Sequence, residues 1–134
     1  MKHLEVAAGI LVYNNKILCT QRNVHKYSYL SFKYEFPGGK LEPGETKSEA
    51  LMRELNEELD LKVSVSEDDF FKTVSYTYPD FSVTLHFYLC HLQSDAFTLK
   101  EHAGFKWLQT DELKTLDWAP ADVPIVEELE KRGI

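Results

Sequence analysis

The stretch that decides how this 134-residue chain is interpreted consists of two short segments separated by a helix start. GGKLEPGE stands at residues 38–45, and RELNEEL stands at residues 53–59. Between them, Thr46 and Glu49 have the spacing of a capping box, in which each side chain bonds the other residue's backbone amide. The pattern predicts a helix that begins after Thr46 and runs to about the end of the second segment.

Two faces of this expected helix carry different side chains. Leucines recur every four residues and predict a stripe buried against a sheet, formed by Leu51, Leu55 and Leu59. Glu54, Glu57 and Glu58 stand at i, i+3 and i+4 on another face, where like charges repel by about 0.2–0.5 kcal/mol per pair. Hard divalent cations such as Mg²⁺ or Mn²⁺ take oxygen ligands and would relieve that repulsion. Considered alone, the same acids also fit an ordinary solvated helix face.

The residues before the helix add a second component. Gly38 and Gly39 allow the backbone to bend tightly and to approach a ligand closely. A loop here could lend a carbonyl oxygen to a metal or amides to a phosphate, and we expect residues 40–45, with their Pro-Gly pair, to form such a loop. Glu45 lies just before the helix, where a carboxylate suits the helix N-terminus, and it could reach Arg53 across the first turns.

The joint spacing of these residues resembles the Nudix box. In that motif a Gly is followed after five residues by Glu, and after seven more by Arg-Glu, an aliphatic residue, any residue and Glu-Glu. The matching residues here are Gly39, Glu45, Arg53, Glu54, Glu57 and Glu58. The late Gly of the motif is Asp60 in this chain. Since that Gly normally adopts the left-handed conformation that ends the helix, we expect a shifted helix end without loss of chemistry.

The resemblance covers nearly the whole chain and is closest to the MutT branch of the Nudix hydrolases. Weaker segments fall in the order of that branch: LEVAAGI at residues 4–10, TQR at 20–22, YEFPGGK at 34–40, Glu101 ahead of Trp107, and PADVPIV at 120–126. The EFPGGK and WAPADVPIV segments look most like the CTP pyrophosphohydrolase group. The 8-oxo-dGTP hydrolases carry Asn in place of Asp122.

The resemblance implies an α+β protein with the Nudix fold, an α/β/α sandwich around a mixed central sheet. It implies attack of a metal-activated water on a phosphorus of a nucleoside triphosphate, which releases a nucleoside monophosphate and pyrophosphate. By position, Glu54, Glu57 and Glu58 would hold Mg²⁺, with Mn²⁺ as a possible substitute. The Gly38 carbonyl and Glu101 would complete the site, although Glu101 alone fits an exposed loop acid.

The resemblance also implies roles for residues around the metal. Glu54 is the first candidate for the general base. Arg53 would orient Glu54 and pair with Glu45, and Lys40 would lie near the leaving phosphates. These roles agree with the chemistry, because phosphoryl transfer depends mainly on positioning and charge neutralisation.

Three residues outside the box are candidates for binding the substrate. Arg22, at an expected strand end, could contact phosphate through its guanidinium or could be a surface charge. Asp122 could accept a hydrogen bond from an exocyclic amine such as that of cytosine, or it could start a helix. Phe36 could stack on a base, although core packing is the favoured explanation. None of the five histidines has zinc-ligand spacing, and only His102, next to Glu101, is of interest.

The rest of the pattern predicts one domain over residues 1–134, with strands, a helix, more strands and a second helix. Apolar and β-branched runs predict strands at residues 4–13, 16–21, 34–36, 61–65, 70–78, 82–92 and 105–108. Residues 23–33 have no clear period and predict a loop, and residues 110–113 predict one helical turn. A closing amphipathic helix is expected at residues 121–131. Its buried face is expected to carry Val123, Val126 and Leu129.

Composition limits the class of protein further. The net charge of −7 disfavours binding to nucleic acid polymers, which needs a basic surface. Cys19 and Cys90 are too few for a disulfide framework. There is no apolar run long enough for a transmembrane helix and no signal peptide pattern at the start. We expect a cytoplasmic protein, monomeric or homodimeric, whose partner is a nucleoside triphosphate and which contacts no membrane.

Several substrates and functions remain open from the sequence. The expected triphosphate could be CTP, dCTP or an oxidised or methylated nucleotide. The box alone does not separate such enzymes from Nudix hydrolases of nucleotide sugars or dinucleotides, although the short chain favours triphosphates. A binding module with a retired active site would be expected to lose some acids, and here all of them are present.

Overall fold

A computed structural model describes all residues from 1 to 134. Its seven strands are β1 (Lys2–Tyr13), β2 (Lys16–Gln21), β3 (Tyr34–Glu35), β4 (Gly38–Lys40), β5 (Phe70–Thr77), β6 (Phe81–His91) and β7 (Gly104–Leu108). Its two α-helices are α1 (Lys47–Leu59) and α2 (Val123–Arg132). Short 3₁₀ segments lie at Ser28–Leu30, Glu67–Asp69, Thr110–Thr115 and Pro120–Asp122.

Strand β1 organises the sheet, whose order is β3-β2-β1-β6-β5. It runs parallel to β6 along nearly its whole length, whereas every other pairing is antiparallel, so the sheet is mixed. Along its other edge, β1 pairs with β2 near Tyr13 and with β4 near Ala7. Strand β7 pairs with β2 and not with β1. Two different strands therefore share one edge of β1.

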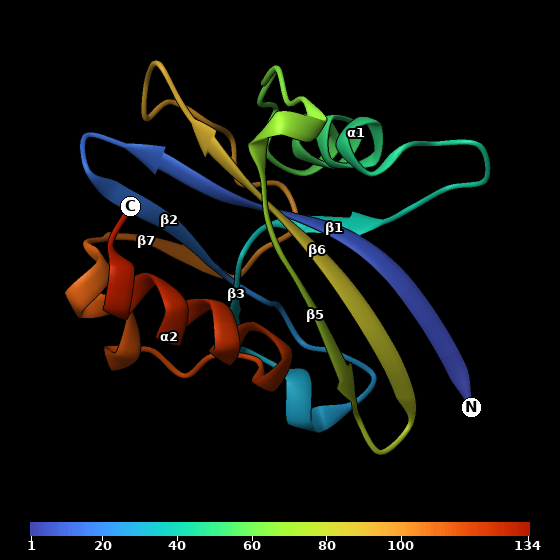
Figure 1. The fold of residues 1–134 in the computed structure, drawn as a ribbon. Helices are drawn as coiled ribbons and strands as arrows, with labels where there is room; N and C mark the ends of the chain where they lie inside the picture. Colours follow the sequence, from blue (N-terminus) through green and yellow to red (C-terminus); the bar gives the residue numbers. More distant parts are fainter.

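The two helices cover opposite faces of this sheet, as Figure 1 shows. Each face has its own buried core. On the α1 side, the core includes Ala7, Leu11, Leu51, Leu55, Leu59 and Tyr88. On the α2 side, it includes Ile10, Ile17, Phe87, Ile125, Val126 and Leu129. The expected α/β/α sandwich with a mixed sheet is confirmed, and the leucine stripe of α1 is buried as predicted.

The ends of α1 are set by local bonds. Thr46 Oγ1 accepts from the Glu49 amide at 3.2 Å, and the Thr46 amide donates to Glu49 Oε1 at 2.8 Å, which is the predicted capping box. At the other end, Asp60 adopts the left-handed conformation with φ 54°, and the Leu61 amide donates to the Leu55 carbonyl at 3.2 Å. Asp60 thus takes the conformation usually given to Gly, so the expected shift of the helix end does not occur.

Two sequence predictions about strands were wrong. Residues 61–65 form no strand; Leu61, Val63 and Val65 alternate because they pack on the α1-side core, not because they join a ladder. Gly38–Lys40 was expected to begin a loop, yet it forms β4. The reason is tertiary: the edge of β1 beyond its short pairing with β2 is open to it, and β4 pairs there.

The second helix also differs from the prediction. It begins at Val123, after the 3₁₀ turn Pro120–Asp122. Val123 is 38% exposed, and Ile125 lies in the core in its place, together with the predicted Val126 and Leu129. The loop at residues 23–33 contains one 3₁₀ turn. Neither helix has the length and apolar character needed to cross a membrane.

Candidate active site

The guanidinium of Arg53 joins helix α1 to the segment that precedes it. Its Nε and Nη2 donate to the two carboxylate oxygens of Glu45 at 2.7 and 3.0 Å. Its Nη1 donates to Glu54 at 3.0 Å and to Glu57 at 3.2 Å, and Nη2 also reaches the Lys40 carbonyl at 2.9 Å. Such bidentate, charge-assisted bonds are strong and directional, and Arg53 lowers the pKa of Glu45. The expected pairing of Arg53 with Glu45 and Glu54 is present.

The two glycines of β4 bring the backbone against the helix and against β1. A Cβ atom at Gly39 would lie only 2.2 Å from the carboxyl carbon of Glu54. A Cβ atom at Gly38 would lie 2.1 Å from the carbonyl oxygen of Ala7. Both contacts are far below ordinary van der Waals separation, so only glycine permits this arrangement. The absence of a side chain at Gly39 leaves room for the Glu54 carboxylate.

Glu58 is the most electrostatically perturbed acid of the helix. Burial, a hydrogen bond with Glu54, and the charges of Glu35 and Glu101 all raise its pKa. Its carboxylate lies 3.7 Å from Nε2 of His102, which also lies 3.4 Å from Glu35. Negative charge is therefore concentrated where α1 meets the loop that carries Glu101.

This donor set fits a hard divalent cation. Its members are carboxylates and a backbone carbonyl, which are the ligands that Mg²⁺ and Mn²⁺ prefer. A cation would also stabilise the ionised form of Glu58, whose pKa is raised first by burial and then by the neighbouring acids. No three His, Cys, Asp or Glu side chains already converge on one point, and Arg53 holds oxygens of Glu54 and Glu57. An ion bound by three of these acids would therefore require some of them to take other rotamers.

A cavity of about 360 Å³ opens beside these acids. Its apolar wall includes Leu4, Val6, Ala8, Leu30, Val83 and Leu85, and its aromatic lining comes from Tyr27, Phe36, Tyr78 and Phe81. At one end it reaches the β4 glycines, Lys40, Glu58, Glu101 and His102. Three of the predicted metal ligands therefore line the same cavity as the predicted substrate-binding residues: Gly38, Glu58 and Glu101. Glu54 and Glu57 do not line it.

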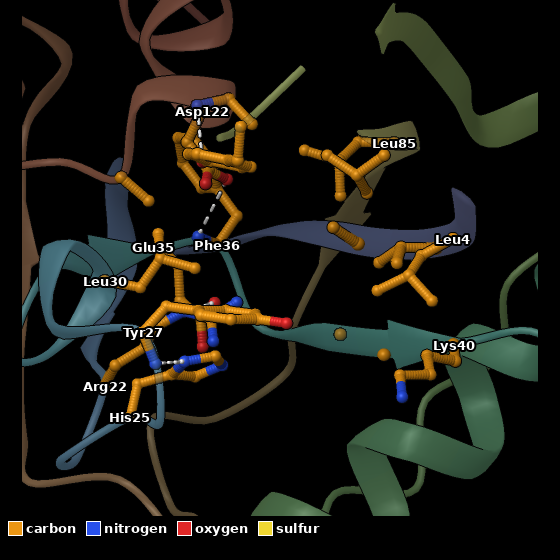
Figure 2. A pocket seen from close by; sticks show the side chains of 18 of the residues that line it. Leu4, Arg22, His25, Tyr27, Leu30, Glu35, Phe36, Lys40, Leu85 and Asp122 are labelled. Atoms are coloured by element: carbon orange, nitrogen blue, oxygen red, sulfur yellow. Dashed lines mark hydrogen bonds and ion pairs between the residues drawn. The ribbon is translucent and has the colours of Figure 1, made fainter. Parts of the chain in front are cut away.

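The polar groups of the cavity gather around Glu35 and Phe36, as Figure 2 shows. Asp122 lies on one side of them, and Arg22, His25 and Tyr27 lie on the other. Arg22 Nε is 2.9 Å from a carboxylate oxygen of Glu35, and its side chain is one-third exposed. The three predicted substrate-binding residues, Arg22, Phe36 and Asp122, are thus brought together although they are far apart in the sequence.

Asp122 is buried and does not cap the helix that follows it. Its side chain makes no capping bond at α2. Instead its Oδ1 accepts a long hydrogen bond of 3.4 Å from the Phe36 amide. Burial above all, and then the charge of Glu35, raise the pKa of Asp122 well above its ordinary value. The raised pKa favours the protonated form of the Asp122 carboxyl group, and that form presents one donor and one acceptor.

Phe36 belongs mainly to the core. Its ring stacks on Trp118 with centroids 4.7 Å apart and meets Phe87 edge-on at 5.8 Å. Only 2% of the residue is exposed. Core packing therefore explains where most of the Phe36 ring lies. The backbone amide of Phe36 contacts Asp122.

The sequence analysis missed Glu35, Tyr27 and Tyr78 as residues of the cavity. Glu35 could have been suspected, because it is a charged residue inside the otherwise apolar YEF strand. Tyr78 is buried, which raises its pKa to about 12, and its hydroxyl accepts from the Ala121 amide at 3.0 Å. Tyr27 comes from the 23–33 loop, whose sequence has no periodicity that would place it.

The comparison with protein families settles what this arrangement belongs to. The NUDIX domain family matches residues 3–129. The chain belongs to the Nudix family. The match includes the β4 glycines, the acidic helix and the loop with Glu101, so the Nudix elements are those that build the site described above.

Two Nudix relatives from Escherichia coli (strain K12) align with almost all of the chain. It is 34% identical over 132 residues to an 8-oxo-dGTP diphosphatase, which covers 98% of this chain and 99% of the relative. It is 35% identical over 129 residues to a CTP pyrophosphohydrolase, which covers 95% of this chain and 91% of the relative. The chain is therefore a MutT-like Nudix pyrophosphohydrolase, equally similar to relatives named for two different nucleotides.

Solved Nudix structures show the same architecture. The E. coli ORF135 protein superposes with a TM-score of 0.79 at 31% identity, covering 99% of this chain and 95% of that one. MutT from methicillin-resistant Staphylococcus aureus 252 superposes with a TM-score of 0.76 at 40% identity, covering 99% and 100%. The Nudix fold of this chain is thus shared over its full length.

Proposed function

We propose that this Nudix protein hydrolyses a nucleoside triphosphate to a nucleoside monophosphate and pyrophosphate, with Mg²⁺ as its cofactor and Mn²⁺ as a substitute. One observation carries the proposal: a cavity of nucleoside size reaches Glu58 of α1, together with Glu101 and the glycines of β4. Its volume of about 360 Å³ lies in the usual range for small-molecule sites. Its apolar and aromatic walls suit a base and sugar, and its acidic end suits a metal-bound triphosphate.

The acids of the Nudix box would hold the metal. Glu54, Glu57 and Glu58 are the proposed side-chain ligands, with the Gly38 carbonyl and Glu101. A divalent cation bound there supplies charge neutralisation for the phosphates and lowers the pKa of a coordinated water. The raised pKa of Glu58 supports the assignment, because burial and the neighbouring acids disfavour its ionised form, which a bound cation would stabilise.

The remaining residues would hold the reacting groups in position and accept the proton of the attacking water. Glu54 is the proposed general base, which takes a proton from the water whose oxygen attacks phosphorus, while the bond from phosphorus to the leaving oxygen breaks. Its bond to Arg53 at 3.0 Å and the close approach of Gly39 support this role, since both hold its carboxylate in one place. Lys40 is exposed at the acidic end of the cavity, where an ammonium would stabilise the departing phosphates.

Asp122 is proposed to read the base. A protonated carboxyl group offers a donor beside an acceptor, which matches the ring nitrogen and exocyclic amine of cytosine. The same pair also matches the oxygen and adjacent N–H of 8-oxoguanine, in the way an asparagine amide would. CTP or dCTP is therefore the first candidate and an oxidised guanine nucleotide the second, in line with the names of the two E. coli relatives.

Arg22 is proposed to contact substrate phosphate or to keep Glu35 in place. Its one-third exposure leaves guanidinium nitrogens available while Nε lies beside Glu35. Phe36 contributes its amide and the edge of its ring to the cavity. We further propose a small-nucleotide substrate with no nucleic acid polymer or membrane as partner, a cytoplasmic location and a monomeric or homodimeric state.

The test is pyrophosphate and monophosphate release with Mg²⁺ across canonical, oxidised and methylated nucleoside triphosphates, with ADP-ribose and a diadenosine polyphosphate included. The Glu58→Gln variant should lose activity, whereas Glu127→Gln, which changes an exposed acid of α2, should keep it. Preferential cleavage of ADP-ribose or the dinucleotide would replace the proposed substrate class. Tight nucleotide binding without turnover in either metal would indicate a retired active site.

A further inference from the structure

His102 lies at the junction between the base-binding part of the cavity and the acids of α1. Its imidazole Nε2 is 3.4 Å from Glu35 and 3.7 Å from Glu58, and only 6% of its side chain is exposed. Both neighbours are carboxylates, which accept hydrogen bonds. Nε2 must therefore carry a hydrogen to interact favourably with either of them.

The backbone around His102 is pinned on both sides. The Thr98 amide donates to the Leu59 carbonyl at 2.9 Å, and the Lys100 amide donates to the Glu58 carbonyl at 3.3 Å. The Ala103 amide donates to the Gln21 carbonyl at 2.9 Å. The loop is therefore tied both to the end of α1 and to the end of β2. This attachment leaves little freedom for the imidazole to move away from the two acids.

The other ring nitrogen of His102, Nδ1, does not help to anchor the imidazole. Nδ1 is buried and has no hydrogen-bond partner. A buried polar atom without a hydrogen-bond partner destabilises the folded protein. Hydrogen bonds from Nδ1 therefore do not explain why the His102 ring is held where it is. All polar contacts of the imidazole run through Nε2 to Glu35 and Glu58.

The contacts of His102 connect a row of charged or polar side chains that line the cavity. Arg22 lies against one oxygen of Glu35, His102 lies near the other, and the same Nε2 faces Glu58. Glu35 and Glu58 are both carboxyl groups, and when both are ionised they repel each other unless a donor lies between them. His102 is suited to keep both in fixed positions.

We propose that His102 is a positioning residue whose Nε2 lies between two carboxyl groups, keeping Glu58 in place for the metal and Glu35 in place beside Asp122, the residue proposed to read the base (Figure 2). The inference rests on the proposed function, because it takes Glu58 as a metal ligand. Residues that orient metal ligands from outside the coordination sphere typically contribute about 10- to 100-fold to metal affinity or activity, and the 3.7 Å contact places His102 where it can orient Glu58. Loss of His102 should therefore weaken metal binding even without substrate, and it should also reduce discrimination between bases.

The experiment measures Mn²⁺ binding without nucleotide by electron paramagnetic resonance, in four variants. His102→Leu removes the donor, and His102→Gln places an amide donor near the position of Nε2. His102→Asn is polar but too short to reach it. His86→Leu is the matched control, since His86 is also nearly buried and bonds a carboxylate, Glu5, at 2.8 Å, away from the acids of α1.

We expect His102→Leu and His102→Asn to weaken Mn²⁺ binding about 10- to 100-fold, and His102→Gln and His86→Leu to stay within a few-fold of the parent. In the same proteins, the ratio of kcat/KM between the best and second-best nucleotide should fall in the Leu and Asn variants and recover in Gln. If the Leu variant does not fold, the Gln and Asn pair gives the answer.

Equal Mn²⁺ binding by the parent and the Leu or Asn variants would overturn the role of His102 alone. A parent that binds no Mn²⁺ would overturn the proposed metal site first, and the role of His102 with it. The two failures are therefore distinguished by the parent protein.

Discussion

Replacing Gly39 by alanine tests the placement of Glu54 more directly than replacing Glu54 itself. The new Cβ would lie 2.2 Å from the carboxyl carbon and 2.5 Å from both carboxylate oxygens. Ordinary contact begins at 3.4 Å, so the carboxylate must retreat by about 1.2 Å. A misplacement of about 1 Å can cost on the order of 10²-fold in rate, and we expect kcat to fall by about that factor.

The stability of the Gly39→Ala variant should change little. The obstacle is the end of a flexible side chain, which can turn away without moving the backbone. Restricting the unfolded chain by a Gly to Ala change even contributes about 0.4–1 kcal/mol of stability where the conformation is compatible. We therefore expect a free energy of unfolding within about 1 kcal/mol of the parent.

Gly38→Ala provides the contrast, because its obstacles are backbone atoms of β1. The Cβ would lie 2.1 Å from the Ala7 carbonyl oxygen and 2.6 Å from the Ala8 Cα. Strand β4 must then move away from β1, at a cost of about 1–3 kcal/mol for overpacking. At about 2–8 °C per kcal/mol for domains around this size, calorimetry should show a Tm lower by roughly 2–24 °C.

The assay is pyrophosphate release at saturating Mg²⁺, with Tm measured on the same preparations. Full activity in Gly39→Ala would refute the reasoning, because it would mean that Glu54 does not act from the position seen here. A large loss of Tm in Gly39→Ala with none in Gly38→Ala would refute the assignment of the two glycines to different neighbours.

Three further changes have defined outcomes. Arg53→Lys keeps the charge but not the fork that holds Glu45 and Glu54 together, so kcat should fall about 10²-fold in the same assay. The raised pKa of Asp122 means that the folded protein keeps a proton that the unfolded chain releases near pH 4. The free energy of unfolding of the parent should therefore fall, relative to that of Asp122→Asn, as the pH rises from about 4 through the folded pKa. Urea unfolding across this range checks the sign, and a parent that gains stability relative to Asp122→Asn as the pH rises would contradict the prediction. Chelation of divalent cations should abolish turnover and added Mg²⁺ or Mn²⁺ should restore it, whereas activity in excess chelator would exclude the proposed metal site.

The acidic helix is the part of the site that local sequence predicts well. Its start, its buried leucines and the common face of Glu54, Glu57 and Glu58 follow from a capping box and from 3.6 residues per turn. The reach of Arg53 to Glu45 also spans only eight residues. These features hold because the interacting groups are neighbours on one helix and its leading segment.

Other features depend on which strands meet, and spacing along the chain does not reveal that. The glycines of β4 form a strand only because β1 offers an edge beside β2. The pattern at residues 61–65 looks like a strand yet finds no partner. Val123 is exposed because the 3₁₀ turn before α2 sets the rotation of that helix.

The sequence by itself determined the Nudix helix, its N-terminal cap and its carboxylates, because each of these rests on contacts within a few residues. Only the tertiary structure decided the cavity, in which Arg22, Glu35, His102 and Asp122 come from four separate segments. Their meeting depends on the pairing of β2 with β3 and on the loop that joins β6 to β7. The burial that raises the pKa of Asp122 arises only when those segments close around it.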